Sequence, residues 1–202
     1  MTHTPTSFEV ETFTGRYVDT NLPDPETIKL EDIAHALSQI CRYGGHCSKF
    51  YSVAEHAVAV SKRLERRGCG AVLQLAGLHH DDAEAYLGDI PRPLKGLLRS
   101  MGSAYDNLSM RMDDAIGVSL GIDPASFHLR EIKDADNWML FVEAKHFLPS
   151  GGINWSGSQL DDWGVRQDGL PKRIVTPDYF QGGVDPLTAK QMFLSRHREL
   201  TA

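Results

Sequence analysis

Four polar residues in a row, His-His-Asp-Asp at positions 79–82, interrupt the apolar stretch "AVLQLAGLHHDDAEAYLGD" of residues 71–89. A charge buried in such a segment is costly unless it is paired or bound to a metal. On one continuous helix, His80, Asp81 and Glu84 share a face, because residues three and four apart are neighbours. Imidazole nitrogen beside carboxylate oxygen is a good donor pair for a divalent transition ion. The run therefore predicts one part of a metal site.

Further ligands should show the same pattern, a polar side chain on the apolar stripe of a helix. His56 shows it, because its neighbours at i−3, i+3 and i+4 are apolar. Asp136 shows it as well, whereas Asp134 has polar or aromatic neighbours and is expected to be solvated. A lone histidine or acid of this kind is more often a hydrogen-bonded core residue. Two inward histidines and two inward acids on three helices favour a shared ion, as facing helices commonly supply.

Helical periodicity, with Gly and Pro marking the ends, predicts the helices that must position these residues. The expected helices cover Ile28 to Arg42, residues 48–68, residues 71–89, about Leu97 to Leu120, Pro124 to about Phe147, and a last helix that starts at Asp185-Pro186.

Three other segments complete the expected fold. Residues 8–20 alternate apolar and polar side chains around a Thr-Gly turn, which predicts a hairpin. Pro91 and Pro93 should hold an extended connection toward Lys95. Residues 149–186, which include Trp155 and Trp163, show no period and should form a long ordered loop or cover. The fold class is therefore all-α, a helical bundle with a small N-terminal β-hairpin and a long C-terminal loop plus terminal helix.

Composition narrows the class of protein. The 202 residues, 41% hydrophobic and 24% charged, suit one globular domain over 1–202. A formal charge of −6 argues against binding of duplex nucleic acid, which needs many Lys and Arg contacts to phosphate. Three cysteines without C-x-x-C spacing suggest neither disulfides nor a thiolate site, and no leader or membrane span is visible. A cytoplasmic protein without a membrane partner is expected.

The order of these motifs resembles the HD-domain phosphohydrolases, named for their His-Asp doublet. The resemblance covers about residues 30–148, with an extension over 149–202. It is carried by "AEH" at 54–56, "HDDAEAYLGDIPRPLK" at 80–95 and "KDADN" at 133–137, which stand in the order of that family's H...HD...D set. The doublet followed by E-x-x-x-G-D-x-P-x-P-x-K is specific. It is nearest the bacterial 5'-deoxynucleotidases and the related phage dATP triphosphohydrolases.

The resemblance implies a mononuclear metal site in an HD-domain helical bundle. Its ion would be one divalent transition metal, Zn, Mn, Co, Ni or Fe, because mixed nitrogen and oxygen ligation tolerates all of these. His79 stands where the family usually has an apolar residue, so a shifted choice of His79 for His80 stays open. The implied ligands are His56, His80, Asp81 and Asp136.

The resemblance also implies roles around the metal. Glu84 and Asp89 would act in catalysis, either by orienting water or by moving its proton. The pair Arg42-Tyr43 would hold phosphate and nucleoside, and Lys95 would contact phosphate. From the residues themselves, two more substrate contacts are candidates: Arg92 between its two prolines, and His46 in the glycine loop before the His56 helix.

The function expected is metal-dependent phosphohydrolysis of (deoxy)nucleotides, with 5'-deoxynucleotidase-type release of phosphate as the first reading. A dNTP triphosphohydrolase with the same metal site, a non-catalytic nucleotide-binding HD module and a purely structural helical protein are the alternatives. The family resemblance further implies a homo-oligomer whose partner is a small nucleotide substrate.

Overall fold

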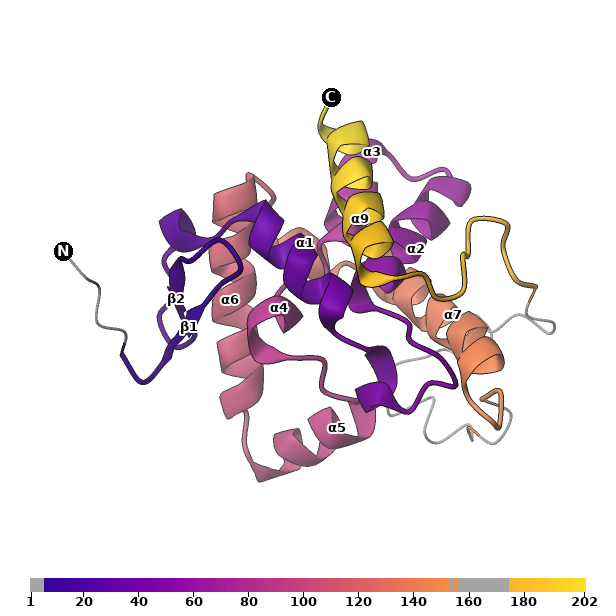
Figure 1. Cartoon of the computed structure of the whole chain (residues 1–202), viewed down its shortest axis with the longest axis horizontal. Coiled ribbons are helices and arrows are strands. Elements are labelled where there is room, and N and C mark those ends of the chain that lie inside the picture. Colours follow the sequence, from indigo (N-terminus) through magenta and orange to yellow (C-terminus); the bar gives the residue numbers. More distant parts are fainter. Residues whose placement is uncertain (1–5, 153–154, 156–174) are drawn as a thin grey trace.

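The computed structural model describes residues 6–152, 155 and 175–202. This part of the chain is mainly α-helical with one two-stranded antiparallel hairpin (Figure 1), which confirms the expected class. No helix of the described ranges is long and apolar enough to cross a membrane. The elements in chain order are β1 (Glu9–Glu11), β2 (Tyr17–Asp19), η1 (Pro25–Thr27), α1 (Leu30–Gln39), η2 (Arg42–Gly45), α2 (Val53–Arg66), α3 (Ala71–Leu78), α4 (Glu84–Leu87), α5 (Arg92–Met101), α6 (Ala104–Leu120), η3 (Pro124–His128), α7 (Arg130–Phe147) and α9 (Pro186–Thr201).

The predicted hairpin forms and is tied to the first helix. Val10 pairs with Val18, and the turn between the strands contains Gly15 at φ 78°. Buried Asp32 of α1 accepts hydrogen bonds from the side chain of Thr12 and from both the backbone N–H and the hydroxyl of Thr14. These bonds stabilise the hairpin, because an isolated two-stranded sheet is marginally stable in water.

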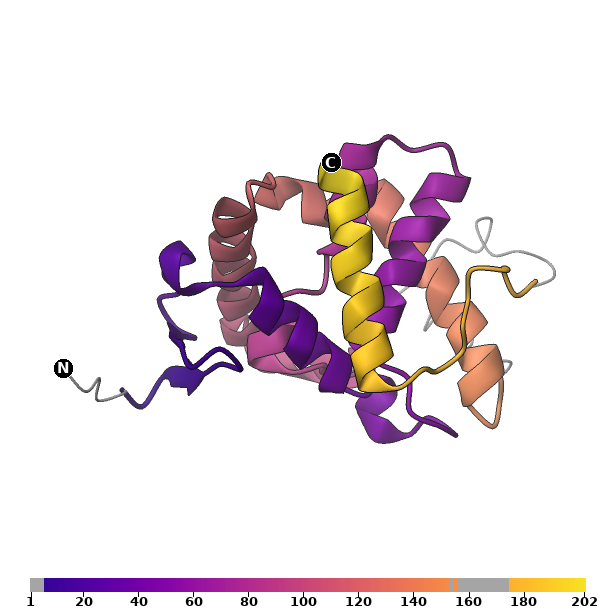
Figure 2. The same cartoon turned by 45° about the horizontal axis from the view of Figure 1, so that its top comes forward.

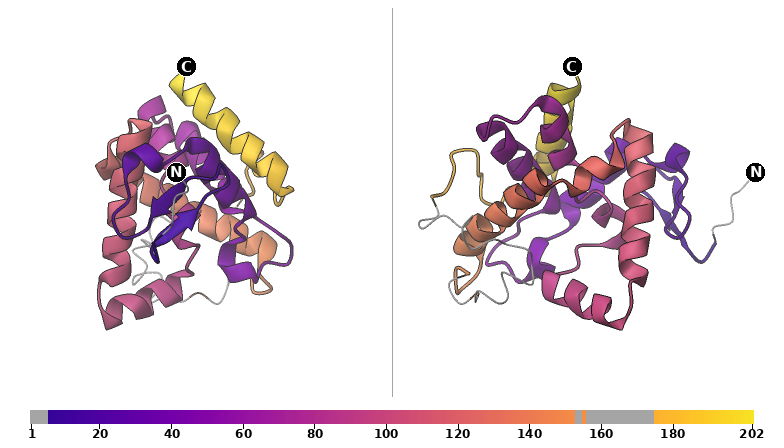
Figure 3. Two further views of the ribbon diagram at one scale, coloured as in Figure 1. Left: turned by 60° about the vertical axis from the view of Figure 1, so that its left-hand side comes forward. Right: turned by 180° about the vertical axis from the view of Figure 1, so that it is seen from behind.

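Helix α2 is the central element of the core. It packs against α1, α3, α7 and α9. Figure 2 shows α9 lying along one side of α2, and the right-hand view of Figure 3, seen from behind, shows α7 on the side turned to the viewer. Apolar residues of α2 join two core clusters, one with α1 and α9 and one with α7. A polar side chain placed in the middle of α2 is therefore enclosed by protein.

The beginning of α2 is fixed by a capping box. The Ser52 hydroxyl accepts a hydrogen bond from the backbone N–H of Glu55, and the Glu55 carboxylate accepts from the backbone N–H of Ser52. This arrangement satisfies donors that a helix start leaves without partners. The helix therefore begins at Val53, later than the expected residue 48, and His56 lies in its first turn.

The expected helix over 71–89 is broken, which corrects the prediction. Helix α3 ends at Leu78, turns cover 79–83, and the short α4 starts at Glu84. Within this turn the His79 imidazole bonds the Asp82 carboxylate at 2.6 Å. His80, Asp81 and Glu84 consequently do not share one helical face, although the turn still brings them near one another.

A close helix contact precedes this turn. At Gly77 a β-carbon would overlap Leu64 Cδ1 of α2, so a larger residue there would require the buried Leu64 side chain to shift. The position of the following four polar residues relative to α2 depends on that contact.

The proline segment also differs from expectation. Helix α5 begins at Arg92, and Pro93 lies in its first turn, where a missing N–H costs nothing. The single helix expected from about Leu97 to Leu120 is two helices, α5 and α6, separated at Gly102, whose φ of 141° is not helical. Lys95 is therefore a helical residue and not the end of an extended connection.

Other boundaries shift by smaller amounts. The helix expected over Ile28 to Arg42 spans Leu30–Gln39. Asp123-Pro124 opens the short η3, and α7 follows from Arg130. The start of the last helix is confirmed, since the Asp185 side chain accepts from the backbone N–H of Thr188. Most of the loop expected over 149–186, including Trp163, lies outside the described residues.

Candidate metal centre

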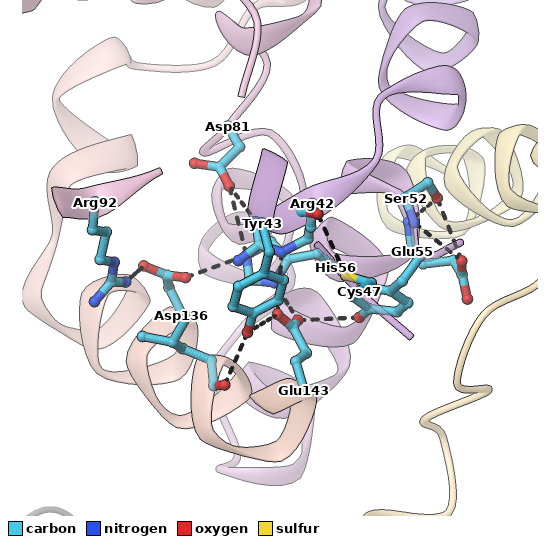
Figure 4. Close-up of polar contacts among 12 residues, drawn as sticks. Arg42, Tyr43, Cys47, Ser52, Glu55, His56, Asp81, Arg92, Asp136 and Glu143 are labelled. Carbon is cyan, nitrogen blue, oxygen red and sulfur yellow. Dashed lines mark hydrogen bonds and ion pairs between the residues drawn. The ribbon is translucent and has the colours of Figure 1, made fainter. Parts of the chain in front are cut away.

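Four side chains that the sequence singles out as ligands converge at the centre of the helical bundle. They come from three elements that the core holds together. Figure 4 shows the carboxylates of Asp81 and Asp136 directed toward His56. The converging residues are His56 of α2, His80 and Asp81 of the turn after α3, and Asp136 of α7.

The distances in this cluster suit a single ion. His56 Nε2 lies 3.3 Å from Asp136 Oδ1 and 3.6 Å from Asp81 Oδ2, and His80 Nε2 lies 3.3 Å from Asp81 Oδ2. Ligand atoms of His56, His80 and Asp136 all fall within 4.8 Å of one another. Ligands bonded at about 2.1 Å to one tetrahedral ion lie roughly 3.4 Å apart. The cluster can therefore hold a metal ion.

Hydrogen bonds orient both imidazoles for coordination. Nδ1 of His56 donates to Glu143 Oε1 at 2.6 Å, and Nδ1 of His80 donates to the Gly77 carbonyl at 2.9 Å. Each Nε2 is buried, and among the described residues no group meets hydrogen-bond geometry with it. In metal sites, the ring nitrogen that does not bind the metal usually donates such a hydrogen bond, which fixes the tautomer of the histidine. Both Nε2 lone pairs thus face the carboxylates of the cluster.

The charges of the cluster also favour a cation. Burial raises the pKa of Asp136, but Arg92 and His56 outweigh it and hold that pKa well below its usual value. In the metal-free protein, burial and Arg42 lower the pKa of His56, yet the Glu143 and Asp136 carboxylates raise it to about 9. The Asp136 carboxylate therefore stays ionised because of the positive charge beside it.

Glu143 is a site residue that the sequence analysis missed. It lies seven residues after Asp136, two turns along the same face of α7, and it is fully buried. Its neighbours at i−4, i−3 and i+4 are Met139, Leu140 and Phe147. The criterion that selected Asp136, an acid on an apolar stripe, therefore applies to Glu143 as well.

A cavity of about 320 Å³ opens beside the cluster. Apolar residues complete its wall, including Ile90, Leu140, Leu148 and Trp155. The site residues predicted from sequence line it, except two residues of the cluster, His56, which is buried, and His80, which is half-buried. Those lining residues are Arg42, Tyr43, His46, Asp81, Glu84, Asp89, Arg92, Lys95 and Asp136.

Cationic side chains in this wall have carboxylate partners. Arg42 lies 3.1 Å from Glu143 and 3.6 Å from Asp81. Lys95 contacts Glu84 at 2.8 Å. Arg92 donates to Asp136 and Asn137 at 2.5 Å each. These cations are held in place before any ligand binds.

Two pocket residues have unusual local states. Burial and the nearby Asp81 charge raise the pKa of Glu84 to about 8, although Lys95 opposes them, and Glu84 Oε2 is buried without a hydrogen-bond partner. Tyr43 has φ 58° and ψ 28°, a left-handed conformation uncommon outside glycine. Its hydroxyl lies 3.1 Å from the Leu140 carbonyl and 3.3 Å from Glu143 Oε2, so these two acceptors share its single proton and hold the ring in the pocket wall.

His79, the alternative ligand left open by the sequence, lies outside the cluster of His56, His80 and Asp136. Its Nδ1 bonds Asp82 at 2.6 Å, and its Nε2 lies 2.9 Å from Nδ1 of His197 on α9. The ring also meets Phe193 edge-on. Of the two adjacent histidines, His80 faces the site and His79 anchors the turn to the last helix.

Comparison with known proteins identifies relatives. The chain is 35% identical to the uncharacterised protein YfdR of Escherichia coli over 146 residues, which span 72% of this chain and 76% of YfdR. The chain belongs to the family of YfdR. An uncharacterised protein of Rhodobacter capsulatus is 36% identical over 138 residues, 65% of this chain and 68% of that protein. No protein-family model matches the chain. These relatives of the YfdR family carry no named activity, so function must be argued from the site.

Proposed function

We propose that the protein is a metal-dependent phosphohydrolase that releases phosphate from (deoxy)nucleoside 5'-monophosphates. One observation carries the proposal: a cluster with two inward-facing imidazole nitrogens and ionised carboxylates lies beside a pocket that also presents Arg42, Arg92 and Lys95. A metal and fixed cations at one cavity suit a phosphoryl group, whose oxygens carry the charge that both must balance.

The residues of the cluster fit a divalent ion. His56, His80 and Asp136 offer nitrogen and oxygen atoms within 4.8 Å of one another, and Asp81 adds a carboxylate beside both imidazoles. An ion held there would supply a Lewis acid that polarises a phosphoryl oxygen and activates water. Mixed ligation accepts Mn, Fe, Co, Ni or Zn.

Proton movement falls to the acids of the pocket wall. Because the pKa of Glu84 is raised to about 8, its carboxyl holds a proton near neutral pH and can donate it to the departing sugar oxygen. Asp89 lines the same cavity and is the candidate to orient the attacking water. Glu84 and Asp89 then divide the acid and base roles that the sequence analysis left undivided.

The charge of the pocket favours a monophosphate over a triphosphate. Its wall holds three cationic side chains, Arg42, Arg92 and Lys95, against the three carboxylates of Asp81, Asp89 and Asp136, with Glu84 counted as protonated. Within the described chain each of those cations is already paired with a carboxylate. With a divalent ion bound, the pocket would carry a small net positive charge. Such a charge suits a dianionic monophosphate better than a triphosphate, whose negative charge is larger.

A product screen tests this function. Protein loaded with Mn²⁺, Co²⁺ or Zn²⁺ is incubated with dAMP and with dATP, and free phosphate and triphosphate are measured separately. We expect phosphate from dAMP to dominate. Triphosphate from dATP as the main product would support the triphosphohydrolase reading, and nucleotide binding without either product would support a non-catalytic module.

A matched pair of variants controls that screen. Asp136→Asn removes a cluster carboxylate, and Asp134→Asn makes the same change two residues earlier on α7, at a side chain that is 41% exposed and 3.9 Å from Arg130. Turnover should fall at least 100-fold in Asp136→Asn and remain near wild type in Asp134→Asn, because loss of a ligand disables metal chemistry. Equal loss in both variants would contradict the assignment.

A further inference from the structure

Glu143 joins the metal cluster to the wall of the substrate pocket through its two oxygens. Oε1 accepts from His56 Nδ1 at 2.6 Å and from the Tyr51 hydroxyl at 3.1 Å. Oε2 accepts from Arg42 Nε at 3.1 Å and from the Tyr43 hydroxyl at 3.3 Å. The carboxylate is fully buried, and Figure 4 shows these contacts gathered around it.

The four donors explain how an ionised carboxylate persists at this depth. A buried charge is costly unless it is paired and hydrogen-bonded, and Glu143 has one cation, one imidazole and two hydroxyls around it. If any one of these side chains were removed, a donor or an acceptor of the network would be left without a partner. The network therefore has a single well-defined arrangement.

The two oxygens serve different parts of the site. On one side, the bond from His56 Nδ1 sets the direction of its Nε2, which lies 3.3 Å from Asp136. On the other side, Arg42 and Tyr43 line the cavity, and the Tyr43 backbone is in the left-handed region at φ 58°. A residue in that conformation persists only where its surroundings hold it. The bond from the Tyr43 hydroxyl to Glu143 is one such restraint.

We propose that Glu143 is the positioning residue that fixes both the metal-binding nitrogen of His56 and the pocket side chains Arg42 and Tyr43. The inference rests on the proposed metal-dependent function for the identity of what these groups bind. It extends that function because it assigns a role to a residue that touches neither the ion nor the cavity. One buried carboxylate would set the geometry between metal and substrate.

Substitution of Glu143 by glutamine tests the two parts of this role, the orientation of His56 and the position of the pocket side chains. The amide of Glu143→Gln has one oxygen and one NH₂ group, so it can accept from His56 Nδ1 or from Arg42 Nε, but not from both. We expect the affinity for Co²⁺ to fall about 10- to 100-fold, as with loss of other outer-shell partners of a metal-bound histidine. The visible absorption of bound Co²⁺ should shift as well, because the imidazole is no longer held in one orientation.

The effect on the pocket side chains is measured by chemical labelling of Arg42 and needs no turnover assay. Arg42 is buried and paired in the wild type, so phenylglyoxal should label it slowly, as mass spectrometry of its peptide would show. In Glu143→Gln the labelling should become at least fivefold faster. These two measurements use binding and modification only. A wild type that binds Co²⁺ but hydrolyses no nucleotide would therefore remove the proposed function and leave this result intact.

Glu55→Gln is the matched control. Glu55 is also a buried glutamate, adjacent to His56 in sequence, but it bonds Ser52 and the backbone N–H groups of Gly183 and Val184, away from the cluster. It should lose stability while its Co²⁺ affinity and its Arg42 labelling stay within about twofold of wild type. Should Glu143→Gln not fold, Glu143→Asp, one methylene shorter, takes its place. Co²⁺ affinity within twofold of wild type, or Arg42 labelling no faster than in Glu55→Gln, would overturn the proposal.

Discussion

Arg92 and Asp136 form an ion pair at 2.5 Å that joins the first turn of α5 to the cluster on α7. The other carboxylate oxygen of Asp136 lies 3.3 Å from His56 Nε2. Asp136 can therefore offer one oxygen to an ion while Arg92 keeps the other. Because α5 has no buried residue, the contacts that its side chains make with the pocket matter for its position.

The adjacent histidines should differ in metal binding. His80→Ala removes a nitrogen of the cluster and should abolish stoichiometric Co²⁺ binding at micromolar concentration. His79→Ala removes the contacts to Asp82 and His197 and should lower the free energy of unfolding by about 1 to 3 kcal/mol, as expected when buried groups lose hydrogen bonds. Calorimetric titration with Co²⁺ measures the first effect. Retention of stoichiometric binding in His80→Ala, with loss in His79→Ala, would reverse the assignment.

Arg92 should matter for substrate more than for the ion. Arg92→Met should raise KM about 10- to 100-fold, since a charge-assisted hydrogen bond is worth about 1.5 to 3 kcal/mol. Co²⁺ affinity should change less, because Asp136 keeps the oxygen that faces His56. Steady-state kinetics at saturating metal gives KM, and Arg99→Met, which removes an exposed arginine of the same helix, is the control. Unchanged KM would remove Arg92 from the substrate site.

Asp113 should make the metal-free protein less stable as pH rises. Burial and the charges of Asp81 and Asp82 raise its pKa to about 8. The unfolded chain loses this proton near pH 4, whereas the folded chain keeps it to about pH 8, so the folded state binds more protons between these limits. The contribution of Asp113 to stability should fall across that window by up to about 1.4 kcal/mol per pH unit.

Asp113→Asn tests this pH dependence. The amide resembles the protonated carboxyl and does not titrate, so the variant should gain stability relative to wild type as pH rises from 5 to 8. Urea unfolding of both metal-free proteins at several pH values measures the difference. A constant difference across this range would show that Asp113 does not carry the effect.

Gly77 should be needed for the approach of α3 to α2. Gly77→Ala places a methyl group against Leu64 and should cost about 1 to 3 kcal/mol of stability, as overpacking does. Gly96→Ala is the control, because Gly96 lies inside α5 with nothing within 4 Å of its added β-carbon, and it should stabilise by up to about 1 kcal/mol. Denaturant unfolding compares both. An equal effect in the two variants would mean that the contact at Gly77 is unimportant.

Local pattern was sufficient to predict most elements and to find the residues of the candidate metal cluster. The hairpin, α7 and α9 follow from alternation, periodicity and capping residues that depend on near neighbours. His56 and Asp136 were recognisable because a polar side chain on an apolar stripe is expensive to bury without a partner. Glu143 follows the same rule, because Met139, Leu140 and Phe147 surround it on α7.

Tertiary contacts explain what local pattern did not predict. At the break over 79–83, the ring of His79 meets His197 and Phe193 of a helix more than a hundred residues later in the chain. No short-range period contains that information. The extended connection predicted at Pro93 was wrong for another reason. Proline suits both an extended connection and the first turn of a helix, so its presence does not distinguish them.

Crystals of the wild type grown with Co²⁺ and measured at the cobalt absorption edge test the central claim most directly. An anomalous peak should lie about 2.0 to 2.3 Å from Nε2 of both His56 and His80, with Asp81 and Asp136 oxygens completing the shell. A peak bound elsewhere, or fully loaded crystals in which these four side chains face apart, would contradict the metal centre and the activity proposed from it.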